Sequence, residues 1–147
     1  MMSSDYVVAF TVSLIATIST VMLHYEAFIG LSRIVSQSKI SHRRRMLLLV
    51  FGLLVAHIVA IWVFGVSAWW LIQVQGIGEL AGYDTLVFLD YIFMSAVTYS
   101  TLGYGDMIPL GPVRFLYGTQ GLVGFVLITW SASFAFIEMQ NNWPKRE

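Results

Sequence analysis

Residues 99–106, YSTLGYGD, overlap the end of an apolar run, residues 85–100, whose single charge is Asp90. That run is too short to cross a bilayer and return, so we expect a half-helix that enters the membrane and stops. Irregular backbone at membrane depth is tolerated only where protein buries it or where it lines a water-filled cavity. The stretch therefore predicts a re-entrant helix followed by a cavity-lining loop.

The two glycines of this stretch suit a row of parallel backbone carbonyls. Such a row needs a φ that is positive, or nearly so, at alternate residues, and glycine adopts positive φ at low cost. One chain supplies only one wall, but four copies around an axis would form stacked oxygen rings that replace the hydration shell of a cation. The oxygens are the Thr101 hydroxyl and the carbonyls of Thr101, Leu102, Gly103 and Tyr104.

The composition indicates a membrane protein. Of 147 residues, 58% are hydrophobic and only 11% are charged, which is far from the balance of a soluble domain. The net charge of zero gives no support to nucleic acid binding. The chain has no cysteine, so disulfides and thiolate metal sites do not arise.

Three stretches are long enough to span the membrane. Residues 6–23 are uncharged and would rise about 27 Å as a helix, with the helical pattern continuing to about residue 35. No basic segment precedes them, so we expect a retained anchor and not a cleaved signal peptide. Residues 46–72 and 113–139 are the other two spans. The connecting segments, predicted as a loop and a short turn, are residues 73–84 and 107–112.

The basic residues give an orientation. All eight Lys and Arg residues except Arg114 fall on one predicted side of the membrane, which the positive-inside rule makes the cytoplasm. The N-terminus is then outside, the C-terminus is inside, and the half-helix enters from outside. The cytoplasmic residues are Arg33, Lys39, Arg43, Arg44, Arg45, Lys145 and Arg146.

The run SAVTYSTLGYGD, residues 95–106, resembles the pore helix and signature sequence of potassium channels, which usually read T-x-G-Y-G-D. The similarity extends over residues 46–140, with 46–72 as the outer helix and 113–139 as the inner one. It implies a selectivity filter at residues 101–105 that binds K⁺, with Asp106 at the outer mouth. Leu102 replaces the usual Val or Ile. At the positions that support the filter, this chain has Val97 in place of a glutamate and Phe93 or Met94 in place of a tryptophan.

The resemblance also implies roles along the inner helix. Gly124 aligns best with the bending glycine, with Gly118 and Gly121 as alternatives. Close helix packing is an equally good interpretation of these small residues. Helical spacing from Gly124 then implies a stripe that lines the inner cavity and closes it by dewetting at Phe136. The stripe comprises Ile128, Ala132, Phe136 and Gln140.

The ionisable residues within the spans have simple structural interpretations. His24 and Glu26 are expected to be solvated at the cytoplasmic end of the first run, or Glu26 to pair with Arg33, although a proton-sensing role is an alternative. His57 is expected to be a hydrogen-bonded packing residue, and Asp90 a structural partner near the outer interface and not an ion ligand.

The basic cluster, Arg43, Arg44 and Arg45, lies at the predicted membrane surface. It is a topology signal, and it also predicts attraction to anionic lipid. Neither early span contains arginines at every third position, so no voltage sensor of that type is expected.

Together these features predict an all-α membrane protein with three transmembrane helices, a re-entrant pore helix and a filter loop, assembled as a homotetramer. Residues 1–40 would form an accessory helix with a cytoplasmic extension, and 41–147 the pore domain. The expected function is passive, potassium-selective conduction across a cell membrane, of prokaryotic type from the small size. Alternatives are a weakly selective cation channel and a non-conducting regulatory subunit that needs a partner. An enzyme is not expected, because neither a nucleophilic triad nor a phosphate-binding loop is found.

Overall fold

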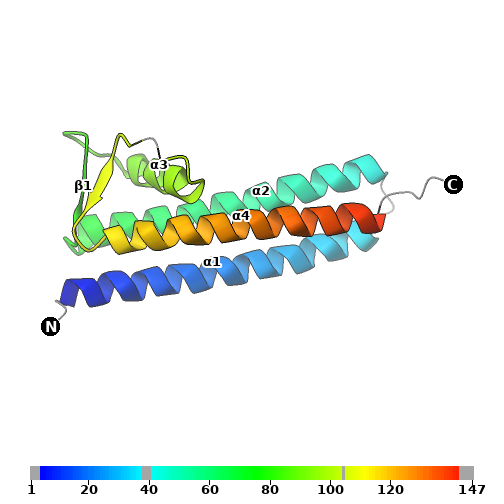
Figure 1. The fold of residues 1–147 in the computed structure, drawn as a ribbon, viewed down its shortest axis with the longest axis horizontal. Helices are drawn as coiled ribbons and strands as arrows, with labels where there is room; N and C mark the ends of the chain where they lie inside the picture. The colour runs from blue at the N-terminus through cyan, green and yellow to red at the C-terminus, as the bar shows by residue number, and fades with distance from the viewer. Residues whose placement is uncertain (1–3, 38–40, 104, 143–147) are drawn as a thin grey trace.

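The computed structural model describes residues 4–37, 41–103 and 105–142. Three long helices run along the molecule, and a short helix and a two-stranded ribbon lie across one end (Figure 1). Four residues that the sequence analysis singled out fall outside the described residues. They are the filter residue Tyr104 and the basic residues Lys39, Lys145 and Arg146.

The long helices are α1 (Ser4–Gln37), α2 (His42–Trp69) and α4 (Arg114–Asn142). A π-helical turn, η1 (Trp70–Val74), continues α2. Each of the three long helices, with α2 taken together with η1, is long and apolar enough to cross a membrane. A helix suits this environment because it satisfies its backbone hydrogen bonds internally. The three predicted spans are confirmed, with ends that differ by a few residues: α2 begins four residues before its predicted start, and α4 begins one residue later and ends three residues later than predicted.

Helix α3 (Phe88–Tyr99) is the predicted half-helix, at 12 residues. Its first turn is closed by Asp90, whose carboxylate accepts a hydrogen bond from the backbone N–H of Val87 at 2.7 Å. This bond satisfies a donor that the helix start leaves unpaired. The interpretation of Asp90 as a structural partner is thereby confirmed.

The two segments predicted as a loop and a turn instead pair with each other. Strand β1 (Glu79–Ala81) lies antiparallel to β2 (Ile108–Leu110), with Leu80 opposite Pro109. A pairing between segments 29 residues apart gives no local signal, and their glycines and prolines predict turns when they are considered alone. The prediction of irregular structure here was wrong over these six residues.

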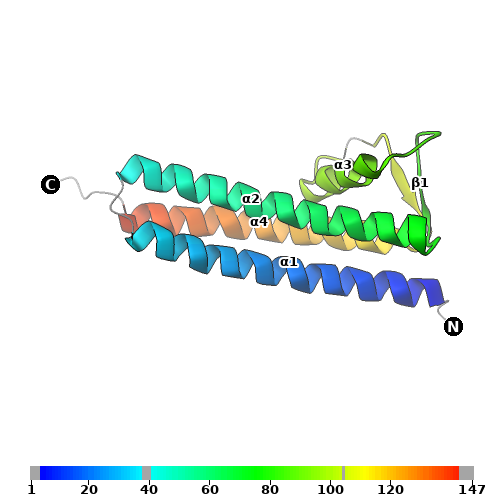
Figure 2. The same ribbon diagram turned by 180° about the vertical axis from the view of Figure 1, so that it is seen from behind.

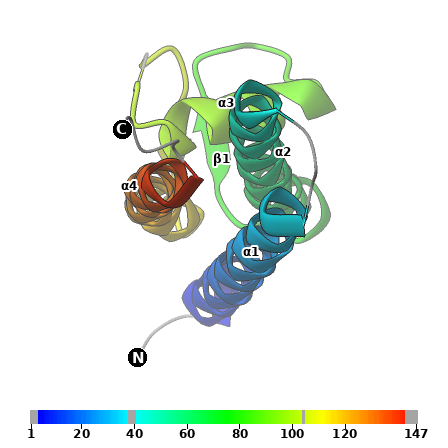
Figure 3. The same ribbon diagram turned by 90° about the vertical axis from the view of Figure 1, so that its right-hand side faces the viewer.

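Helix α1 packs against α2 and α4 on the face away from α3 (Figures 1 and 3). Small residues allow the close approach: Ala9 and Ala16 of α1 are buried in one cluster with Ala60 and Phe64 of α2 and Leu116 of α4. Between apolar helices in lipid, such packing is the main source of association.

The ends of the chain agree with the predicted topology. The N-terminal end of α1 lies at the end of the molecule that carries α3 and the ribbon, and the C-terminal end of α4 lies at the other (Figures 1 and 2). An odd number of spans requires this arrangement.

Candidate functional site

The filter segment, residues 101–106, connects the end of α3 to β2. Among its described residues, positive φ occurs at every second position: Thr101 at 59°, Gly103 at 58° and Gly105 at 80°. Positive φ at both glycines is what the carbonyl row requires. Thr101 was not predicted to adopt it, and a β-branched residue does so only where the surrounding structure holds it there.

The inner end of the filter segment is tied to α3 by backbone hydrogen bonds. The carbonyl of Val97 accepts from the N–H of Leu102 at 3.1 Å and from the N–H of Gly103 at 3.5 Å, and the carbonyl of Thr98 accepts from Thr101. The Val97 side chain is buried. Val97 thus contacts the filter segment through its carbonyl, which a comparison of side chains does not reveal.

The outer end of the filter segment lies against the ribbon. Gly82, which follows β1, approaches the backbone of Asp106 so closely that a Cβ at Gly82 would collide with the Asp106 carbonyl. Its φ of 135° is also open only to glycine. Gly82 therefore allows the end of β1 to approach the backbone of Asp106.

In the described part of the chain, no residues pack against the open side of the filter segment. Thr101, Leu102, Gly103, Gly105 and Asp106 are all exposed, and a Cβ added at either glycine would meet no atom within 4 Å. The Phe93 side chain on α3 is also 47% exposed.

A buried polar network holds α3 in place. The amide of Gln120 on α4 donates to the carbonyl and hydroxyl oxygens of Ser95 on α3, and the Ser95 hydroxyl donates to the carbonyl of Ile61 on α2 at 2.7 Å. Gln120 and Ser95 are fully buried. Sequence reasoning missed both residues. Their signal was a polar side chain within an apolar run, which a membrane helix keeps only with a partner.

Gly124 brings α4 against the end of α3. A Cβ at this position would collide with the carbonyl oxygen of Tyr99 and lie 2.8 Å from its carbonyl carbon. At Gly121 a Cβ would make only ordinary contact, at 3.9 Å from Thr98, and at Gly118 it would meet nothing within 4 Å. Gly124 is thus a close-packing residue, as one of the two interpretations held, and its role as a hinge stays a prediction.

The predicted cavity stripe faces away from α1. Phe134 and Glu138 of α4 contact α1, through a stacked ring contact with Phe28 at 4.6 Å and a hydrogen bond from Ser32 at 2.7 Å. Two residues turn a helix by about 200°. The exposed residues Ile128, Ala132 and Phe136 therefore lie on the opposite face of α4.

The comparisons with known proteins agree with this geometry. A family model described as "Ion channel" matches residues 45–141, which is more than half of the chain and includes α3, the filter segment and α4. The chain belongs to this ion channel family. No curated protein and no solved structure matches it. The protein is therefore a multi-pass membrane protein of an ion channel family, and this membership points to a non-enzymatic role.

In this ion channel the expectation of a solvated His24 was wrong. His24 has no exposed surface, and its ring lies 4.8 Å from that of His57. The register of α1 against α2 causes the difference: His24 lies 13 residues before the end of α1, about 20 Å along the axis. Hydropathy alone does not fix that register. The expectation that His57 is hydrogen-bonded is confirmed.

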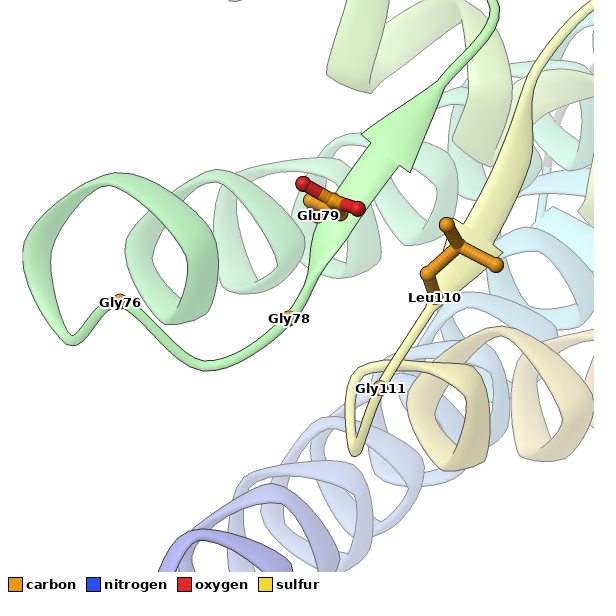
Figure 4. A pocket seen from close by; sticks show the side chains of 5 residues that line it. All are labelled: Gly76, Gly78, Glu79, Leu110 and Gly111. Carbon is orange, nitrogen blue, oxygen red and sulfur yellow. The ribbon is translucent and has the colours of Figure 1, made fainter.

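A shallow pocket of about 310 Å³ lies beside the ribbon of the channel (Figure 4). Gly76, Gly78 and Gly111 contribute only backbone to it, and Glu79 and Leu110 extend from the paired strands. It lies apart from the filter segment, and nothing in its lining assigns it a ligand.

Proposed function

We propose that the protein is a passive, potassium-selective channel formed by a homotetramer, with K⁺ passing along residues 101–105. The observation that carries the proposal is positive φ at Thr101, Gly103 and Gly105, at every second position of a segment whose described residues are all exposed. Carbonyl rings need this backbone, and they need three further copies to close.

The surroundings of the filter segment support the same proposal. Helix α3 ends at Tyr99, with only Ser100 between it and the segment, so the negative end of its dipole is near the proposed ion path. The stripe of Ile128, Ala132 and Phe136 lies on the face of α4 away from α1, where an inner cavity is required. Asp106 is exposed beyond the last filter residue, as an acid at the outer mouth should be.

Three further assignments belong to the proposal. The channel lies in the cell membrane, with the ribbon outside. Gly124 acts as a hinge during gating, in addition to its packing contact. The basic cluster binds anionic lipid, and the exposed side chains of Arg43 and Arg44, with the partly buried Arg45, at the start of α2 suit this contact.

Ion flux from liposomes tests the proposal. The purified chain is reconstituted, its oligomeric state is measured by cross-linking, and flux is followed under opposed K⁺ and Na⁺ gradients. Gly103→Ala should abolish K⁺ flux, because alanine at positive φ costs about 1–2 kcal/mol in each chain. Gly30→Ala on α1 is the matched control, since its Cβ would meet no atom within 4 Å and its φ is not positive.

Each outcome has a defined meaning. A K⁺-selective flux that Gly103→Ala removes and Gly30→Ala keeps supports the proposal. Flux without selectivity refutes it in favour of a weakly selective cation channel, in which the changed residues at Phe93 and Val97 loosen the filter. A folded tetramer that carries no flux until another membrane protein is added would make the chain a regulatory subunit.

A further inference from the structure

Three side chains from three helices form a hydrogen-bonded chain that ends at Tyr99, two residues before the filter segment. His24 of α1 lies with Nδ1 2.9 Å from the carbonyl oxygen of Thr20 and with Nε2 3.2 Å from Nδ1 of His57 on α2. The same Nδ1 of His57 lies 2.9 Å from the hydroxyl of Tyr99, the last residue of α3. The side chains of His24 and Tyr99 are almost fully buried.

Counting protons along this chain reveals a competition. The Thr20 carbonyl can only accept a hydrogen bond, so Nδ1 of His24 carries a proton. In neutral His24, Nε2 is then unprotonated and carries a lone pair. If Nδ1 of His57 is also unprotonated, it accepts a hydrogen bond from the Tyr99 hydroxyl, and the lone pairs of the two imidazoles face each other. If it carries a proton, it donates to His24, and the Tyr99 hydroxyl loses its acceptor. A single nitrogen of His57 therefore serves two neighbours.

A proton added to His24 decides this competition. Nε2 then donates to Nδ1 of His57, in direct competition with the Tyr99 hydroxyl, while Nδ1 continues to donate to Thr20. The bond between His57 and Tyr99 weakens. Tyr99 is two residues from Thr101, where the positive φ begins, so a change in this bond acts on the inner end of the filter segment.

The surroundings give the pair no other ionic partner among the described residues. On α1, Phe28 packs edge-on against His24, while Glu26 and Arg33 are exposed. Residues 46–74 of α2 and η1 contain no charged side chain, and on α3 Asp90 binds its own helix start. On α4, Glu138 accepts a hydrogen bond from the Ser32 hydroxyl, two helical turns from His24, and Arg114 is exposed at the other end of the helix. The positive charge of a proton on the pair is thus stabilised mainly by the hydrogen bonds of the two histidines.

We propose that His24, His57 and Tyr99 form a positioning link through which the accessory helix α1 controls the filter. In acid, the hydrogen bond between His24 and His57 strengthens at the expense of the one between His57 and Tyr99, and conduction decreases. This inference rests on the proposed channel function. It assigns α1 a role in regulation, in addition to its packing against α2 and α4.

The test compares two buried tyrosines. Tyr99→Phe removes the hydroxyl that meets His57 and keeps the ring. Tyr117→Phe is the matched control, because the Tyr117 hydroxyl on α4 is buried and has no hydrogen bond in the described part of the chain. K⁺ flux of each reconstituted protein is measured from about pH 8 to about pH 4, a window that covers the range in which an unperturbed histidine changes charge and extends below it.

We expect flux of the unmodified protein and of Tyr117→Phe to fall by roughly fivefold in acid, the factor that one net hydrogen bond provides. Tyr99→Phe and His24→Phe should be nearly independent of pH in this range. Full pH dependence in either variant overturns the link, even if its absolute flux is reduced by a general loss of stability.

A second measurement separates this inference from the channel function. The nitrogen-15 resonances of the His57 ring are recorded in the purified protein, without any need for flux. A change of the Nδ1 resonance in Tyr99→Phe but not in Tyr117→Phe supports the link. If that resonance is unchanged, the link is refuted whether or not the protein conducts. If the resonance changes but no K⁺ flux is found at any pH, the channel function fails, and with it the role in conduction.

Discussion

The contact between Gly124 and Tyr99 allows the same substitution to be tested at two neighbouring positions with opposite expected results. At Gly124, a methyl group would collide with the carbonyl oxygen of Tyr99 and lie 2.8 and 3.0 Å from its carbonyl carbon and Cα. These are backbone atoms of a packed helix end, so they cannot turn aside as a side chain can. At Gly121, one turn earlier, the methyl group would make ordinary contacts at 3.9 Å from Thr98.

The magnitudes follow from two terms. Replacing glycine by alanine within a helix favours the folded state by about 1 kcal/mol, and this term is common to both positions. Overpacking costs about 1–3 kcal/mol, and the upper part of that range applies to Gly124 because α4 or the end of α3 must move. Gly124→Ala should therefore destabilise the protein by about 2 kcal/mol, whereas Gly121→Ala should stabilise it by up to about 1 kcal/mol.

Thermal unfolding in detergent, followed by circular dichroism, measures the change in stability. K⁺ flux measures the effect on conduction. Because Tyr99 immediately precedes Ser100 and the filter segment, its displacement in Gly124→Ala should also reduce flux. If Gly124→Ala were as stable as Gly121→Ala and conducted equally well, the close approach of α4 to Tyr99 would be refuted.

Three further predictions concern other contacts. Gln120→Leu should destabilise the protein by about 2 kcal/mol in thermal unfolding, because Ser95 loses the donor to both of its oxygens; equal stability would contradict the network. Asp90→Ala should cost about 1 kcal/mol, since the N–H of Val87 loses its acceptor at the start of α3, and hydrogen exchange confined to that turn would report it. Changing the basic cluster to alanine should weaken binding to anionic vesicles by up to about 3 kcal/mol, with no change on neutral vesicles; an equal effect on both would exclude a charge-based contact.

Local sequence determined the elements along which ions are proposed to pass. Long uncharged runs predict spanning helices because a bilayer leaves backbone groups no partner except each other. The apolar run before YSTLGYGD is too short to span, so α3 was predicted as a half-helix. Gly103 and Gly105 were assigned positive φ because that backbone is open to glycine at low cost, and both adopt it.

Tertiary structure decided what holds these elements together. The pairing of β1 with β2, the contact of Gly124 with Tyr99 and the bond of Gln120 to Ser95 join residues far apart in the chain, and hydropathy contains no information about such partners. The clearest case is His24, which the sequence suggests is solvated and the structure buries against His57. An apolar helix can pack in many registers of similar hydrophobicity, and only the fit of side chains between α1 and α2 selects the one that brings these two imidazoles together.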